Sequence, residues 1–348
     1  MTLEIVRPGM FTTIQDRGRF EYRRDGVVTS GAMDQYSWQV ANLLVGNTNE
    51  QPPCRENNAA LEFYLVGPSI DFHEDAIIAV YGGQWNAMLD GQPFPRGRPY
   101  TVRQGQRLEI QEAFLGCWGY LAIHGGLDIA PTLGSRSTHV RSAIGGFHGR
   151  CINRGDKIPI VVTNGYTHNW PTYRNCYLPW HDLVYLDGSA APASSAIRII
   201  SGAHWDLLDE GSRLSMLSDP WFISKKSDRM GYRLESFNLA EGSEQRVLKL
   251  ASPFEMFSEP TAIGTVQLPP AGEPIVLMAD AATTGGYPRI AHIAEVDLPR
   301  FAQQPPGTAI RFELISHGQS RLLQLARNQT MKRLKGMLDY LRRSPEDK

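Results

Sequence analysis

The sequence has few of the features that mark metal, redox or membrane proteins. Its 348 residues include only four cysteines, none of them in a CxxC pair, and its nine histidines are scattered. This predicts free thiols and no metal site. No run of about 18 apolar residues is present, and the first residues lack the cationic and apolar regions of a signal peptide. The sequence therefore predicts a cytoplasmic protein that does not enter a membrane.

Neither sign of charge is in excess. Thirty-five Lys and Arg residues oppose 36 Asp and Glu residues, so the net charge is −1. A balanced charge gives no electrostatic basis for binding nucleic acid. The sequence also lacks a Walker-type phosphate loop, a GxSxG motif, an HExxH motif and a GxGxxG motif in a βαβ setting. No self-contained active site is indicated by these motifs.

Glycine and proline, by contrast, are plentiful, at 33 and 23 residues. Short apolar runs separated by Gly or Pro extend from Leu61 to Ile160 and resume from Ile197 to Ile315, which favours many short strands. We therefore predict a mainly β fold of two β-rich units with few short helices. The predicted divisions are an N-terminal β domain at 1–165, a Pro-rich connecting segment at 166–195, a C-terminal β-barrel domain at 196–316, and a tail at 317–348.

Two helices are predicted. The first begins at a Ser30 cap and ends before Gly46, because apolar residues lie at helical spacing between them. The second occupies the tail from Arg321 to Arg343, with an interruption near residues 328–330. The tail carries an excess of positive charge. Two interpretations stay open for it, a solvated helix packed on the barrel or a contact with an acidic partner or a membrane.

One stretch near the end of the second β-rich half resembles a binding corner. A short apolar run, Ile275–Ala279, predicts a buried strand that ends in Asp280 and is followed by a Gly-rich turn. The turn supplies three more polar side chains, Thr283, Thr284 and Tyr287. A charge at the end of a buried strand needs a partner, and Arg229 of the segment SDRMGYRL is the predicted one. The alternative is a tight turn whose polar groups cap its own backbone.

A second cluster lies in the first half, in the segment LGSRST. It contains Arg136, Ser137 and Thr138. An Arg fork with neighbouring hydroxyls suits a carboxylate or phosphate ligand. The alternative is an Arg–Asp pair that locks a β-loop, and the residue pattern leaves both interpretations open.

Taken together, these segments resemble a known family, the allophanate hydrolase subunit 2-like or biotin-dependent carboxyltransferase-like proteins. The resemblance covers roughly residues 3–315 and departs from the family in an insertion at 51–58 and in Ala281 and Ala282. The matching segments are TTIQDRGR, SGAMD, ANLLVGN, LEFYLVGP, YLAIHGGLD, LGSRST, SDRMGYRL, VQLPPAGEPIVLMAD, TTGGYPRIA and PPGTAIRF.

The resemblance implies a cyclophilin-like β-barrel and a function shared with partner proteins. Members include the C-type subunit of 5-oxoprolinase, which with the A-type and B-type subunits opens 5-oxoproline to glutamate and consumes ATP. Under this expectation the chain is an ATP-dependent amidohydrolase subunit that acts on a small amide or lactam and has a B-type and an A-type partner protein. Alternatives are a KipA-like regulatory protein without catalysis and a biotin-linked carboxyltransferase acting on a urea-like substrate.

The resemblance also suggests roles for the candidate residues. Asp280 and Arg229 are the predicted catalytic pair. The predicted substrate-binding residues are Arg136, Ser137, Thr138, Thr283, Thr284 and Tyr287.

Overall fold

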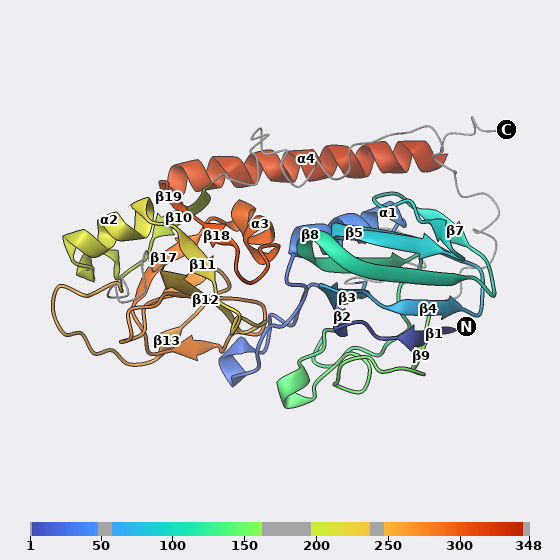
Figure 1. Cartoon of the computed structure of the whole chain (residues 1–348), viewed down its shortest axis with the longest axis horizontal. Coiled ribbons are helices and arrows are strands. Elements are labelled where there is room, and N and C mark those ends of the chain that lie inside the picture. The colour runs from blue at the N-terminus through green and yellow to red at the C-terminus, as the bar shows by residue number, and fades with distance from the viewer. Residues whose placement is uncertain (1, 48–57, 162–195, 237–246, 344–348) are drawn as a thin grey trace. The chain divides into compact units, whose positions relative to one another are not determined.

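The computed structural model describes residues 2–47, 58–161, 196–236 and 247–343 (Figure 1). The contacts divide the chain into two compact units. Unit 1 contains residues 1–19, 30–184 and 329–348, and unit 2 contains residues 20–29 and 185–328. A short N-terminal segment is thus grouped with the second unit, whereas the predicted connecting segment at 166–195 lies outside the described residues.

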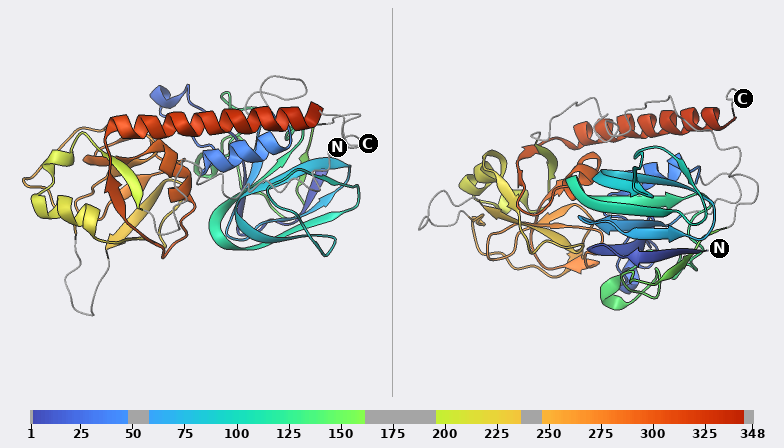
Figure 2. Two further views of the ribbon diagram at one scale, coloured as in Figure 1. Left: turned by 90° about the horizontal axis from the view of Figure 1, so that it is seen from above. Right: turned by 45° about the vertical axis from the view of Figure 1, so that its right-hand side comes forward.

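Unit 1 is built on a nine-stranded sheet in which β5 (Ala76–Leu89) and β8 (Arg107–Ile123) are the longest strands. These two strands pair along most of their length, and register shifts between Gly82 and Ala87 interrupt the ladder. Such bulges bend and twist a strand. One end of β8 also pairs with β4 (Ser69–Phe72) and the other end with β3 (Ala60–Tyr64). Figure 2 shows the resulting curved sheet in blue to green.

The remaining strands of unit 1 extend this sheet. The main order is β2-β3-β8-β4-β1-β9, and β6 and β7 pair with β5. Their bounds are β1 Thr2–Arg7, β2 Phe11–Gln15, β6 Gln92–Pro93, β7 Tyr100–Val102 and β9 Lys157–Pro159.

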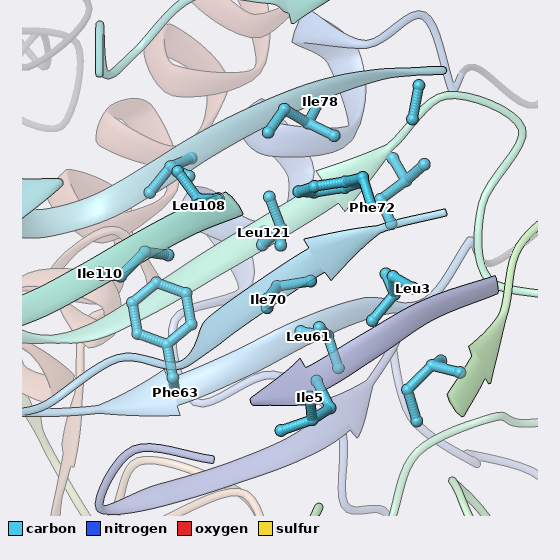
Figure 3. Close-up of a cluster of buried hydrophobic side chains, with 14 of the residues drawn as sticks. Leu3, Ile5, Leu61, Phe63, Ile70, Phe72, Ile78, Leu108, Ile110 and Leu121 are labelled. Carbon is cyan, nitrogen blue, oxygen red and sulfur yellow. The ribbon is translucent and has the colours of Figure 1, made fainter. Parts of the chain in front are cut away.

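The curved sheet of unit 1 encloses an apolar core (Figure 3). Alternate residues of its strands point inward, as in Leu3 and Ile5 of β1 or Ile70 and Phe72 of β4, and each of these is at most 1% exposed. The period-2 alternation of strands produces this arrangement because successive side chains point to opposite faces. The core therefore fixes the register of the strands that carry the polar loops of this unit.

Unit 2 contains an eight-stranded sheet in the order β18-β11-β12-β15-β14-β17-β10-β19. Its two edge strands, β18 (Ala309–Ile310) and β19 (Phe312–Leu314), are separated in the chain by Arg311 alone. Because one residue cannot cross an open sheet of eight strands, the sheet must curl until its edges meet. The other bounds are β10 Ile197–Ser201, β11 Trp221–Ile223, β12 Gly231–Ser236, β14 Thr265–Gln267, β15 Ile275–Leu277 and β17 Arg289–Ile293.

A separate two-stranded ladder, β13 (Glu259–Pro260) with β16 (Thr284–Gly285), lies in the same unit. Short helical elements connect the strands of both units. They are η1 Arg23–Asp25, α1 Gln35–Leu44, η2 Val140–Ser142, η4 Trp205–Leu207, α2 Glu210–Ser218, η5 Glu295–Asp297 and α3 Leu298–Ala302. The long helix α4, His317–Arg343, follows β19 and is drawn in red in Figures 1 and 2. No helix among the described residues is long and apolar enough to span a membrane.

The predicted fold class, mainly β with two β-rich units, a barrel and a C-terminal helix, is confirmed. Two details of the helices were wrong. Helix α1 is capped by Asp34, whose Oδ1 accepts a bond from the Ser37 amide at 2.9 Å, and not by Ser30. Helix α4 runs without interruption, since Asn and Thr cost a helix only a fraction of about 1 kcal/mol and the buried Met331, Leu334 and Leu338 continue its stripe.

Candidate functional site

The predicted binding corner begins where β15 ends in unit 2. Strand β15 pairs with β12 on one side and with β14 on the other. Its ladder with β12 continues beyond the strand, because the Met278 amide donates to the Met230 carbonyl at 3.0 Å and the Asp280 amide donates to the Arg229 carbonyl at 2.8 Å. The backbone thus places Asp280 directly beside Arg229, as the sequence predicted.

The side chains of these two residues form a buried ion pair with two hydrogen bonds. Arg229 donates from Nε to Oδ2 of Asp280 at 2.8 Å and from Nη2 to Oδ1 at 3.0 Å. The two side chains are 7% and 8% exposed. A bidentate pair of this kind fixes the relative orientation of the two side chains and balances their charges. The arrangement locks the start of the corner to β12, and the catalytic role of the pair stays a prediction.

The turn after Asp280 is held by a neighbouring segment. The Thr261 amide donates to the Thr283 carbonyl at 3.0 Å, and the Thr261 hydroxyl donates to the Ala282 carbonyl at 2.6 Å. The ladder between β13 and β16 continues this contact through Pro260 and Thr284. The backbone of the turn is therefore bonded to residues outside the turn, so its side chains are not needed to hold its shape.

Three predicted binding side chains project from this fixed turn. Thr284 and Tyr287 are exposed, and Thr283 is half-buried. None of their hydroxyls forms a hydrogen bond with another residue in the described part of the chain. A rigid turn that presents several hydroxyls to solvent can bind polar oxygen or nitrogen atoms. This arrangement favours the binding-corner interpretation over a turn that caps itself.

Arg23 also contacts this corner, although no sequence pattern had identified it as a site residue. It comes from the segment 20–29, which is grouped with unit 2. Its Nη2 donates to the Thr261 carbonyl at 2.6 Å and to the Thr283 carbonyl at 3.5 Å, and its Nη1 donates to the Thr29 hydroxyl at 2.8 Å. Its neighbour Arg24 is 88% exposed. No local pattern distinguishes the two arginines, so only tertiary structure identifies the one that contacts the corner.

The other predicted cluster, in the segment LGSRST, lies in unit 1 and surrounds the buried carboxylate of Asp16. Its Oδ1 accepts bonds from the hydroxyls of Ser135 at 2.7 Å and Ser137 at 2.6 Å, and its Oδ2 accepts from the Arg136 amide at 2.5 Å. Asp16 is fully buried. A carboxylate with several hydrogen-bond donors is well stabilised inside a protein, so it fixes this loop to the end of β2.

The three predicted binding residues of this loop also bond to the backbone or to Asp16. The Arg136 Nε donates to the Ile129 carbonyl at 2.7 Å, and the Thr138 hydroxyl donates to the Ile14 carbonyl at 3.0 Å. Ser137 and Thr138 are fully buried. These contacts match the loop-locking interpretation, and substrate binding by these residues stays a prediction. The eight predicted site residues thus divide into three in unit 1 and five in unit 2.

The sequence and structure match a defined family and several known relatives. The family model described as "Carboxyltransferase domain, subdomain A and B" matches residues 25–314. The chain is 36% identical to the C subunit of 5-oxoprolinase from Haemophilus influenzae over 305 residues, which cover 87% of this chain and 88% of the relative. It is also 36% identical to the C subunit of 5-oxoprolinase from Escherichia coli over 310 residues, which cover 89% of this chain and 90% of the relative.

A solved structure is similar over nearly the whole chain. The urea amidolyase of K. lactis superposes with a TM-score of 0.81 and 28% identity over 96% of this chain. The match covers 20% of the urea amidolyase, so this chain corresponds to about one fifth of that protein.

Proposed function

Because this chain belongs to the carboxyltransferase family of subdomains A and B, we propose that it is the C-type subunit of a multi-subunit 5-oxoprolinase. The observation that carries the proposal is the match to two proteins named as the C subunit of 5-oxoprolinase, which extends over almost the full length of each. In this proposal the complex opens 5-oxoproline to glutamate and consumes ATP.

The chemistry of the proposed reaction agrees with a division of labour between subunits. A lactam is a resonance-stabilised amide and a poor electrophile, so ATP is used to activate its oxygen. The activated group needs hydrogen-bond donors where negative charge develops. We assign to this chain the binding and orientation of the lactam at the Asp280–Tyr287 corner, with Thr283, Thr284 and Tyr287 as hydroxyl ligands. The nucleotide is assigned to the partner proteins, because this sequence lacks a Walker-type phosphate loop.

Reconstitution tests the proposal. The chain is purified alone and together with A-type and B-type subunits from the same source, and glutamate and ADP are measured after addition of 5-oxoproline and ATP. We expect no glutamate from the chain alone and stoichiometric glutamate and ADP from the complete mixture. A mixture without this chain is the control. An inactive complete complex would contradict the proposal and favour a KipA-like regulatory role.

The match to urea amidolyase supports a second candidate function. That protein contains a region similar to 96% of this chain. The corresponding activity is transfer of a carboxyl group from carboxybiotin on a partner to a urea-like acceptor. Its test is to incubate the chain with a carboxylated biotin carrier and urea and to follow both the loss of the carboxyl group from the carrier and the formation of carboxylated urea. Transfer to urea without glutamate formation from 5-oxoproline would replace the first proposal with this one.

A further inference from the structure

Two hydrogen-bond donors lie side by side on neighbouring strands of unit 2. Gln267 ends β14 and Arg289 begins β17, and the two residues are paired in the register of these antiparallel strands. Paired residues project their side chains to the same face of a sheet, about 5 Å apart at Cβ. Gln267 is 6% exposed, so its amide is held inside the protein.

Both side chains lie against the β13–β16 ladder of the candidate corner. A Cβ atom added to Gly285 would be 2.4 Å from Nε2 of Gln267, so this amide approaches the backbone of β16 closely. On the partner strand, the guanidinium of Arg289 bonds to the carboxylate of Glu259 and, at 3.2 Å, to the carbonyl of Pro260. Glu259 is the register partner of Gly285. The two donors therefore approach the same short ladder.

Each side chain keeps a buried nitrogen donor without an acceptor. Neither Nε2 of Gln267 nor Nε of Arg289 has a hydrogen-bond partner within the described ranges. Buried hydrogen-bond donors almost always have an acceptor in folded proteins, so two buried donors without one on neighbouring strands need an explanation. Two unsatisfied donors on adjacent strands indicate a missing oxygen acceptor, and their position beside the exposed Thr284 places that acceptor at the candidate corner.

The charges at this place favour an uncharged acceptor. The positive charge of Arg289 is already balanced by its ion pair with Glu259, and the Gln267 amide is neutral. A carboxylate or phosphate is normally bound by an arginine whose charge is available to it. With the charge of Arg289 balanced by Glu259, the two side chains offer N–H donors at a place without net charge. Such donors match the carbonyl oxygen of an amide, which has two lone pairs.

From this arrangement we infer that Gln267 and Arg289 bind the carbonyl oxygen of an amide-type ligand, either a lactam or a ureido group. This inference rests on the proposed function for the identity of the natural ligand. It adds the two residues that hold the oxygen and assigns Gly285 the role of leaving room for the Gln267 amide. It also makes Glu259 a positioning residue, since that carboxylate orients Arg289.

Nuclear magnetic resonance of the full chain can test binding without any catalytic step. The side-chain amide signal of Gln267 is assigned by its loss in Gln267→Glu. The probes are 2-pyrrolidone and urea, which have an amide oxygen and no carboxylate, and glutarate, which has carboxylates and no amide. We expect the Gln267 signal to shift with 2-pyrrolidone or urea and to remain in place with glutarate. A shift with glutarate alone, or with none of the three, would overturn the inference.

Variants of the reconstituted complex supply the second readout. Gln267→Glu replaces a donor with a charged acceptor, and Gly285→Ala places a methyl group against the amide. We expect each to raise the KM for 5-oxoproline at least tenfold. Gln92→Glu makes the same charge change at an exposed residue of β6 and should leave the KM unchanged. Thermal unfolding is measured for all three variants, and a KM effect counts only for those that unfold at the temperature of the parent protein.

The two experiments separate this inference from the proposed function. Binding of 2-pyrrolidone or urea at Gln267 in a chain whose complex never forms glutamate would retain the amide site and reject the 5-oxoprolinase assignment. An active complex whose KM is unchanged by Gln267→Glu would retain that assignment and reject the amide site.

Discussion

Arg229 and Asp280 face each other across the extended β12–β15 ladder and are joined by one backbone bond and two side-chain bonds. The two residues are 51 positions apart in sequence. Because the pair is buried, neither charge can be removed without leaving the other uncompensated. Any functional test at Asp280 must therefore distinguish loss of chemistry from loss of structure.

A double-mutant cycle makes this distinction. Removing one partner of a buried ion pair typically costs about 3–5 kcal/mol, whereas replacing both with apolar residues is often close to neutral. We therefore expect Asp280→Leu to lower the free energy of unfolding by about 3 kcal/mol or more, with Arg229→Met similar. The double variant Arg229→Met with Asp280→Leu should recover most of that loss. Denaturant unfolding measures all four proteins.

Activity of the double variant then decides the role of the pair. A stable but inactive double variant would assign chemistry or ligand orientation to the two charges, and a stable and active one would make the pair purely structural. Asp71→Asn is the matched control, because Asp71 pairs with Arg107 at the surface, where the two side chains are 30% and 47% exposed. A surface pair contributes about 0–1 kcal/mol.

A second prediction concerns Arg23. Its guanidinium holds the carbonyls of Thr261 and Thr283 and thereby joins the segment 20–29 to the candidate corner. Arg23→Ala should loosen the corner and raise the KM for 5-oxoproline in the reconstituted complex about tenfold, the effect of roughly 1.4 kcal/mol. The adjacent Arg24→Ala removes the same charge from an exposed side chain and should have no effect. Equal KM values for the two variants would contradict this role.

The sequence predicted the parts of the site that depend on local chain pattern. The apolar run before Asp280 indicated a buried strand, and a buried strand end with a carboxylate required a cation, which identified Arg229. Arg23 and Gln267 were not found, because their significance arises from contacts with carbonyls and with Gly285 that are distant in sequence. The pattern of the LGSRST segment was compatible both with ligand binding and with a loop held by internal bonds. The reason is that a hydroxyl that could bind a ligand, such as that of Ser137, can equally donate to the carboxylate of Asp16.

The fold was predictable in class but not in its division into units. Regularly spaced strands with Gly and Pro between them indicate β structure, because period-2 alternation is a local signal. The grouping of residues 20–29 with unit 2 has no such signal. It depends on bonds such as that from Arg23 to Thr261. The closure of the barrel likewise follows from the pairing partners of β18 and β19, which composition does not specify.

The third prediction tests the loop around Asp16. The Ser137 hydroxyl donates to Asp16 at 2.6 Å, and the Asp16 amide donates to the Ser137 hydroxyl at 2.9 Å. Hydrogen bonds to a charged group contribute roughly 1.5–3 kcal/mol each. Ser137→Ala should therefore lower the free energy of unfolding by an amount in this range and leave the KM for substrate unchanged. A raised KM with unchanged stability would instead support the predicted substrate-binding role of Ser137.

The fourth prediction concerns acid stability. The Arg107 and Arg150 side chains donate hydrogen bonds that lower the pKa of Asp71 and of Asp156, respectively. A carboxyl group with a lower pKa in the folded state stabilises the fold above its unfolded pKa of about 3.9. That contribution is lost as the pH falls through the lower folded-state pKa.

The measurement is the denaturant midpoint between pH 7 and pH 2. We expect the contribution of these two carboxylates to be constant from neutral pH to about pH 4 and to decline below it. The double variant Asp71→Asn with Asp156→Asn should be less stable than the parent at pH 7 and should show a smaller decline in acid. A decline of equal size in both proteins would show that other carboxylates determine the acid sensitivity.

The last prediction concerns helix α4, which lies entirely after the residues matched by the family model. Leu338 is fully buried and Leu334 is 4% exposed, whereas Leu322 on the same helix is 67% exposed. Near its beginning, Leu323 packs on a small core of Ala294, Val296 and Ile315. The helix therefore has one buried face and one exposed face, and the two faces can be tested separately.

Truncating a buried leucine to alanine costs about 2–5 kcal/mol. We therefore expect Leu338→Ala to lower the free energy of unfolding by that amount and Leu322→Ala to change it by less than about 0.5 kcal/mol. If α4 were only a solvated appendage, both variants would unfold like the parent protein. A normal stability for Leu322→Ala combined with weaker binding to the partner proteins would assign the exposed face of the helix to assembly, because burial within the isolated chain cannot account for such an effect.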